Sequence, residues 1–165
     1  MAREIHVALY AVSIEDPDSF VGRLKSESTR LGVSVEAYDA GAVLGVEHLA
    51  VAWERAVRAF ADNRAASDSV AMEARLFASC ERQIKTAIAK TGVKRGKAGV
   101  ALVSEDVKAL EKVAKALGLK RDDYVLAPTS EKLLLWGIKS DKKAHNGQKA
   151  ADQIFERMSL LEVER

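Results

Sequence analysis

The spacing of apolar residues along the chain predicts an alternation of helices and strands. Apolar side chains recur every three or four positions in five stretches, which predicts helices at residues 17–31, 47–62, 69–91, 105–117 and 145–161. Short, continuous apolar runs bounded by turn residues predict strands at residues 5–12, 33–38, 98–103, 124–127 and 133–138. The glycine-bearing stretch 39–45 predicts a loop or an irregular strand end.

Residue types at the ends of these segments support two of the helices. Asp16 before Pro17 is typical of a helix start, and Gly32 is typical of a helix end. Ser104 is placed to cap the helix at residues 105–117, and Gly118 is placed to end it. The boundaries of these helices therefore follow from capping chemistry as well as from periodicity.

The predicted order of elements, β-α-β-α-α-β-α-β-β-α, is that of an α/β protein. The chain has 165 residues, which suits one domain, and its apolar fraction of 48% provides for one core. We expect a single layered α/β domain over residues 1–165, with a mixed central sheet of about 4–5 strands flanked by about five helices.

Charge and cysteine content narrow the possibilities only slightly. The 26 basic and 24 acidic side chains nearly balance, so the net charge of +2 alone does not indicate nucleic-acid binding. The single cysteine excludes an intrachain disulfide and is compatible with a reducing compartment. No apolar run approaches the roughly 18 residues that span a membrane. We therefore expect a cytoplasmic protein without a membrane partner.

The residue types that carry out catalysis do not occur in a recognisable spacing. His6, His48 and His145 are scattered, so a metal site is not expected. Cys80 lies on the apolar side of its predicted helix, which favours a buried structural thiol over a nucleophile. The basic, glycine-containing stretch 94–99 precedes a strand, whereas a phosphate loop of the Walker type follows one. We expect no catalytic residue, no metal and no cofactor.

The long predicted helix at residues 69–91 contains the most informative pattern. One face is apolar, and Glu73 falls within that face, so its carboxylate must pair, accept backbone donors or reach the rim. Arg75 and Arg82 are seven residues apart and share the opposite face, where small neighbours leave their guanidinium groups accessible.

A basic segment follows from the end of this helix. Residues 82–97 contain no acidic side chain and six basic ones, which are Arg82, Lys85, Lys90, Lys94, Arg95 and Lys97. One interpretation is a solvated, lysine-rich helix end that the helix dipole favours. The other is a surface that binds RNA or phosphate, because the rest of the chain is so evenly charged.

Several short motifs in the same region resemble those of one family, the kinase-binding subunit of the KEOPS complex, which is related to the eukaryotic TPRKB proteins. The motifs are Asn63-Arg64-Ala65, Met72-Glu73, residues 78–84 with their ERQI core, Ala87-Ile88, Gly92-Val93-Lys94, and residues 154–163 with Arg157-Met158-Ser159. The ERQI core followed by an Ala-Ile pair is similar to archaeal members. The first 45 residues match only in pattern, and Cys80 stands where we would expect a glycine before ERQI.

The resemblance implies properties that composition cannot show. Members of the family are non-catalytic and bind the small atypical kinase/ATPase subunit of KEOPS at one end of a linear assembly. They help that complex to make the threonylcarbamoyl-adenosine modification on tRNA, and archaeal members bind the CCA end of tRNA. The expected partners are therefore the kinase/ATPase subunit and tRNA, with no small-molecule substrate.

We assign candidate residues to these two partners. The RNA-binding candidates are Arg64, Arg75, Arg82, Lys85, Lys94, Arg95 and Lys97, since arginine planes stack on unpaired bases and lysines meet phosphates. The kinase-binding candidates are Ile154, Phe155, Met158 and Leu161 on the last helix, for which plain core packing is the other interpretation.

A function of another class stays open from the sequence. A small α/β enzyme or ligand-binding domain that acts on a phosphorylated metabolite would use the same basic segment, residues 82–97. An enzyme should show a concave pocket with a perturbed acid or base, whereas an adaptor should show an open basic surface and an exposed apolar helix face.

Overall fold

The computed structural model describes residues 4–123, 129–138 and 147–164. The chain forms two compact units, the first from residues 1–41 and 92–125, the second from residues 42–91 and 126–165. The α/β fold class expected from the sequence is confirmed. That all 165 residues form one domain stays a prediction.

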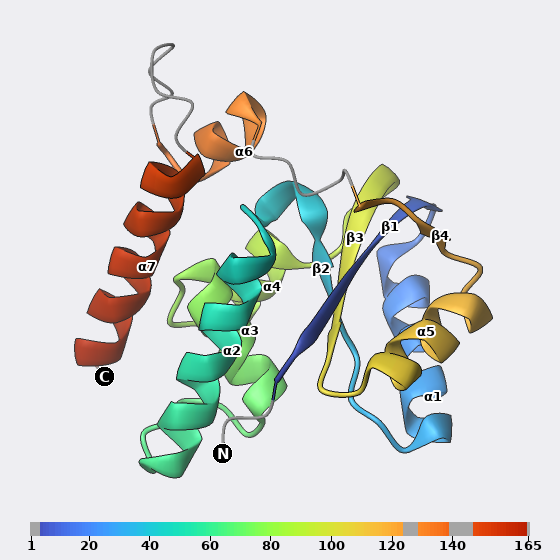
Figure 1. Cartoon of the computed structure of the whole chain (residues 1–165), viewed down its shortest axis with the longest axis horizontal. Coiled ribbons are helices and arrows are strands. Elements are labelled where there is room, and N and C mark those ends of the chain that lie inside the picture. Colours follow the sequence, from blue (N-terminus) through green and yellow to red (C-terminus); the bar gives the residue numbers. More distant parts are fainter. Residues whose placement is uncertain (1–3, 124–128, 139–146, 165) are drawn as a thin grey trace. The chain divides into compact units, whose positions relative to one another are not determined.

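The first unit contains an antiparallel sheet (Figure 1). Its strands in the described residues are β1 (His6–Ile14), β2 (Glu36–Asp39), β3 (Gly96–Ser104) and β4 (Lys120–Arg121), in the order β2-β3-β1-β4. Every neighbouring pair is antiparallel, so the expectation of a mixed sheet is wrong for these residues. The β1–α1–β2 connection leaves β1 and β2 parallel, but β3 lies between them, and the apolar pattern carries no information about which strands become neighbours.

Two helices, α1 (Pro17–Leu31) and α5 (Val107–Ala116), complete this unit and share one core with the sheet. Phe20 and Leu24 come from α1, and Leu110 and Val113 come from α5. These side chains are buried with inward-facing strand residues such as Leu102. The helical and extended periodicities read from the sequence therefore meet in a single apolar layer.

The caps of these helices agree with the sequence in one case and differ in the other. The Asp16 carboxylate accepts the Asp18 N–H, and Gly32 adopts a left-handed conformation with a φ of 66°, as expected for the two ends of α1. The N-cap of α5 is Asp106, not Ser104. The Ser104 hydroxyl instead donates to the Ser34 carbonyl oxygen, which makes it part of a contact between β3 and the approach to β2.

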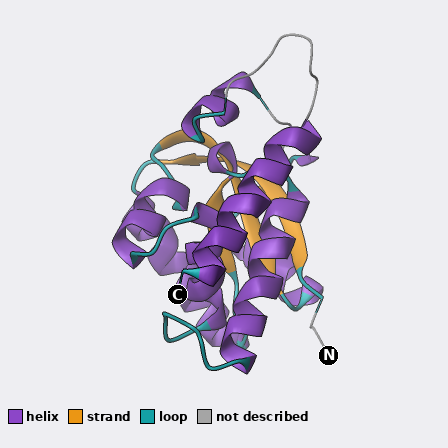
Figure 2. Ribbon diagram, turned by 90° about the vertical axis from the view of Figure 1, so that its left-hand side faces the viewer, coloured by secondary structure: helices purple, strands orange, loops and turns teal. Residues whose placement is uncertain are grey.

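The second unit is helical apart from its connecting turns in the residues that the structure describes (Figure 2). Its helices are α2 (Val46–Ala61), α3 (Val70–Ser79), α4 (Ile84–Thr91), α6 (Ser130–Leu135) and α7 (Gly147–Val163). A 3-10 turn at Ala40–Ala42, which begins in the first unit, precedes α2. Helix α3 packs on α2 and α4, and α7 lies against α2 and α3. This arrangement places α7 beside helices that precede it by about 70 residues or more in the sequence.

Two of the sequence predictions fail in this unit. The helix expected at residues 69–91 is broken at Cys80, whose φ of 55° is left-handed, and the break turns Ile84 and Ile88 to the surface. In place of the strand expected at 133–138, the structure has the end of α6 and the turn after it, because Thr129 caps a short helix and a run of leucines fits either structure. The described residues therefore contain seven α-helices where about five were expected. The strand expected at 124–127 lies outside the described residues.

Candidate functional site

The C-terminal end of α3 forms a tight reversal that sets the geometry of the second unit. The Cys80 N–H donates to the Phe77 carbonyl oxygen at 3.0 Å, and the Glu81 N–H donates to the Leu76 carbonyl oxygen at 3.1 Å. This pattern, with a left-handed residue between its two donors, is a Schellman turn, for which glycine is the usual residue. The glycine expected before the ERQI core thus corresponds to a conformational requirement that Cys80 meets at a cost.

Side chains supply donors to the last two carbonyls of α3. His48 Nε2 lies 2.8 Å from the Ala78 carbonyl oxygen, and Lys90 Nζ donates to the Ser79 carbonyl oxygen at 2.9 Å. The positive charge of Lys90 also sits at the negative end of the α3 dipole. The reversal therefore depends on residues from α2 and α4 as well as on its own backbone.

The imidazole of His48 is buried and held as one neutral tautomer. The Leu44 N–H donates to Nδ1 at 3.1 Å, so Nε2 carries the proton that goes to the Ala78 carbonyl. The pKa of His48 is lowered to about 4 from its ordinary 6.5. Burial is the largest cause, the bond to Ala78 opposes it, and the positive charge of Lys90 adds to the lowering. A histidine with both nitrogens committed to backbone groups serves structure and not proton transfer.

Trp136 holds the same cluster to α6 and α7. The centroid of its ring lies 4.1 Å from Lys90 Nζ. The ring also packs edge to face against the His48 ring, with 5.5 Å between the two centroids. Its Nε1 donates to the Ala42 carbonyl oxygen at 3.1 Å, and its own carbonyl accepts from Arg157 at 2.8 Å. Lys90 is therefore a structural cation and not one that is available for a ligand.

An open hollow of about 510 Å³ lies beside this reversal. It is bordered by residues of the α3–α4 turn, of α4 and of α7, among them Arg82, Gln83, Thr86, Arg157, Leu160 and Glu164. Arg82 donates a hydrogen bond to the Glu164 carboxylate. The hollow thus combines cationic, amide, hydroxyl and apolar groups, which suits a polar and partly flat ligand.

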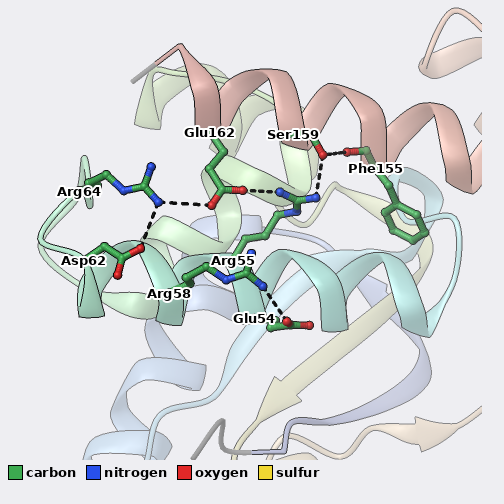
Figure 3. A network of polar contacts seen from close by, with 8 residues as sticks. All are labelled: Glu54, Arg55, Arg58, Asp62, Arg64, Phe155, Ser159 and Glu162. Carbon is green, nitrogen blue, oxygen red and sulfur yellow. Dashed lines mark hydrogen bonds and ion pairs between the residues drawn. The ribbon is translucent and has the colours of Figure 1, made fainter.

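A second polar network joins α7 to α2 (Figure 3). Arg55 donates to the Glu162 carboxylate and, at 2.8 Å, to the Ser159 hydroxyl. The Arg64 Nη2 atom lies 3.1 Å from the Asp62 Oδ2 atom and 3.6 Å from the Glu162 Oε1 atom. The side chains of Arg55 and Glu162 are each only 17% exposed, so this network fastens α7 in place.

The structure corrects the prediction that Arg75 and Arg82 form one accessible face. Arg75 lies in α3, is buried, and donates to the Thr91 hydroxyl at 3.3 Å. Arg82 lies in the turn after Cys80 and is exposed. The helical wheel fails here because it assumes an unbroken helix, so Arg75 is not a surface contact for RNA.

The other RNA-binding candidates fall into two groups. Arg64 and Arg82 are exposed but already paired with carboxylates. Lys85, Lys94, Arg95 and Lys97 are all exposed. Arg64, Arg82 and Lys85 belong to the second unit, whereas residues 94–97 belong to the first. Their use in RNA binding stays a prediction.

Most of the kinase-binding candidates are inside the molecule. Ile154, Met158 and Leu161 are buried and Phe155 is half-buried, which favours core packing over a docking patch for these side chains. The apolar residues that α7 does expose are Leu160 and Val163, which the sequence analysis did not select. Their helical positions one or two residues away from the buried stripe were the signal that would have found them.

Of the expectations for Glu73 and Cys80, the one for Glu73 is confirmed. The buried Glu73 carboxylate accepts the N–H groups of Ala66 and Ser67, each at 3.0 Å, and the Ser67 hydroxyl at 2.8 Å. Burial raises the pKa of the Cys80 thiol to about 11, although the charges of Lys90 and Arg157 lower it. Cys80 is half-buried at the C-cap of α3 and borders the hollow, so it does not lie on the apolar side of a helix as expected, and its role as a structural thiol stays a prediction.

Within residues 4–123, 129–138 and 147–164, no three His, Cys, Asp or Glu side chains form a group that would hold a metal ion. In the same part of the chain, no helix combines the length and the apolar character needed to cross a membrane.

Comparison with protein families assigns the chain to one of them. The sequence model of the family described as kinase binding protein CGI-121 matches residues 14–160. The match covers most of the chain, so this protein belongs to the CGI-121 family of kinase-binding proteins. The resemblance to the KEOPS kinase-binding subunit is thereby confirmed. No curated protein matches the chain.

Proposed function

We propose that this protein is a non-catalytic adaptor subunit of the KEOPS complex. In this role it binds the small atypical kinase/ATPase subunit in the cytoplasm and recruits tRNA through its CCA end for threonylcarbamoyl-adenosine modification. The observation that carries the proposal is the family match over residues 14–160. The sequence resemblance supports the tRNA half of the proposal, and the exposed basic side chains are consistent with it.

The local chemistry supports an adaptor over an enzyme that acts on a phosphorylated metabolite. Two of the cationic side chains that border the open hollow are held by backbone carbonyls: Lys90 donates to Ser79 and Arg157 donates to Trp136. The thiol that borders the hollow has a raised pKa, the reverse of what a nucleophile requires. The strongly perturbed His48 is buried and fully bonded.

The tRNA half is tested with charge reversals at exposed positions. The double variant Arg95→Glu, Lys97→Glu is compared with Lys108→Glu, Lys112→Glu, which makes the same change of charge on exposed residues of α5. If roughly three phosphates of a single strand are contacted, the logarithm of the binding constant should fall with the logarithm of salt at a slope of about −2. We expect at least a tenfold loss for the first variant and little change for the second.

The measurement is the affinity for a tRNA transcript with and without its CCA end, with circular dichroism as the fold control. Equal affinity for the two transcripts would contradict CCA recognition. Equal losses in the two double variants would show that only net charge matters, and absence of binding by the folded wild type would refute the tRNA half.

The kinase half is tested by co-purification with the cognate kinase/ATPase subunit. We expect a stable complex at micromolar concentrations. Leu160→Asp on α7 and the matched Ile88→Asp on α4 change residues that are 54% and 45% exposed, so both variants should fold. Loss of the complex only with Leu160→Asp supports docking on α7, loss only with Ile88→Asp places docking on α4, and no complex with wild type refutes the kinase half.

A further inference from the structure

Two charged residues face each other across the border of the open hollow in the second unit. Arg82 lies in the turn between α3 and α4, and Glu164 follows directly after α7. Both line the hollow of about 510 Å³, and the Arg82 guanidinium donates to the Glu164 carboxylate. The Glu164 carboxylate therefore engages a guanidinium donor that would otherwise be available to a ligand in the hollow.

This pair contributes little to the fold. The side chains of Arg82 and Glu164 are 59% and 55% exposed, and ion pairs with that exposure are screened by water and salt. The neighbouring pair of Arg55 and Glu162 differs, since both side chains are 17% exposed and Arg55 also bonds to Ser159. Two carboxylates on the same helix end thus have different roles, and that of Glu164 is not to hold α7.

The position of Glu164 is also unfavourable for the helix that carries it. Its N–H donates to the Leu160 carbonyl oxygen at 3.1 Å, so its carboxylate sits at the last turn of α7. The C-terminal end of a helix is its negative pole, where basic residues are favoured, and α7 has none in its last turn. Helix stability does not explain a carboxylate at this position, whereas a partner at Arg82 does.

We propose that Glu164 is an intramolecular competitor that occupies Arg82 until an RNA phosphate displaces it. A carboxylate and a phosphate present oxygens to a guanidinium in the same forked geometry, so they compete for the same donors. The inference rests on the proposed tRNA binding and deepens it. The consequence is a threshold: only a ligand that makes further contacts in or near the hollow opens the pair.

The test removes the competing charge and measures the affinity for a tRNA transcript that carries its CCA end. Glu164→Gln should bind about two- to fivefold more tightly than wild type, which is the range expected when an exposed ion pair no longer has to be broken. In wild type the displaced carboxylate takes up a cation when the phosphate binds, whereas Glu164→Gln has no such uptake, so the salt dependence should be steeper in the variant.

Two controls separate competition from a general change of charge. Glu156→Gln removes the same charge from an exposed position of α7, eight residues earlier, and should leave affinity and slope near those of wild type. In an Arg82→Gln background, Glu164→Gln should have no effect, because the donor for which it competes is gone. Thermal melts of all variants confirm the fold.

The outcomes separate failure of the competition from failure of tRNA binding itself. An unchanged affinity in Glu164→Gln, an equal gain in Glu156→Gln, or a gain that persists in the Arg82→Gln background overturns the competition while leaving tRNA binding itself in place. If neither wild type nor Glu164→Gln binds tRNA, the proposed tRNA function and this inference both fall.

Discussion

The left-handed backbone at Cys80 permits a stability test with a predicted sign. A non-glycine residue in this conformation costs about 1–2 kcal/mol, whereas glycine adopts it without that cost. In an ordinary helix the order is reversed, and glycine is about 1 kcal/mol less stable than alanine. The φ of 55° at Cys80 and the two backbone bonds of the Schellman turn therefore predict that Cys80→Gly is more stable than Cys80→Ala.

The magnitude follows from what each variant loses. Both variants remove the partly buried thiol, so that loss cancels in the comparison. What remains is the backbone strain that alanine keeps and glycine releases, less the extra entropy of glycine in the unfolded chain. We expect Cys80→Gly to exceed Cys80→Ala by about 1 kcal/mol, or about 2–4 °C in Tm for a chain of this length.

The assay is urea unfolding followed by circular dichroism, with thermal melts as a second measure. Ala89→Gly, at an exposed position inside α4, is the matched control and should lose about 1 kcal/mol. If glycine proves less stable than alanine at position 80, as it is in a regular helix, then the left-handed turn does not carry the strain argued for it.

Two further predictions concern the polar clusters of the second unit. The pKa of His48 is about 4 in the folded protein, so as the pH falls below 6.5 the unfolded chain takes up a proton before the folded one does. The free energy of unfolding should therefore drop by about 2 kcal/mol between pH 7.5 and pH 5. Urea titrations should show a smaller drop for His48→Gln, and an equal drop would contradict the role given to His48. Glu162→Gln should lower the free energy of unfolding by about 1–2 kcal/mol and Glu54→Gln by less than about 0.5 kcal/mol, because the Arg55–Glu162 pair is sheltered and the Arg58–Glu54 pair is exposed. Equal losses in the same unfolding assay would contradict the conclusion that the Arg55–Glu162 pair holds α7 in place.

The sequence was most informative where structure depends on near neighbours. Asp16 with Pro17 and Gly32 marked both ends of α1, and the apolar run at 98–103 marked the central strand β3. The same local reasoning required partners for Glu73. The resemblance around the ERQI core led to the family, which the match over residues 14–160 then established.

Local patterns were misleading where one residue changes the course of the chain. The apolar arc through residues 69–91 assumed a continuous helix, and the left-handed residue at Cys80 ended it. Arg75 consequently lies inside the second unit, while Arg82 lies on its surface. A glycine at this position would have predicted the turn from the sequence, but a cysteine does not.

What the sequence determined by itself is therefore the set of elements with strong caps and clear periodicity, the α/β class and the family. Only the tertiary structure decided that β3 separates β1 from β2 and that Arg82 meets a carboxylate 82 residues away. It also decided that the candidate kinase contacts on α7 are mostly core. The physical reason is range: caps and periodicity act over a few neighbouring residues, whereas strand order, burial and ion pairs depend on which distant segments come into contact.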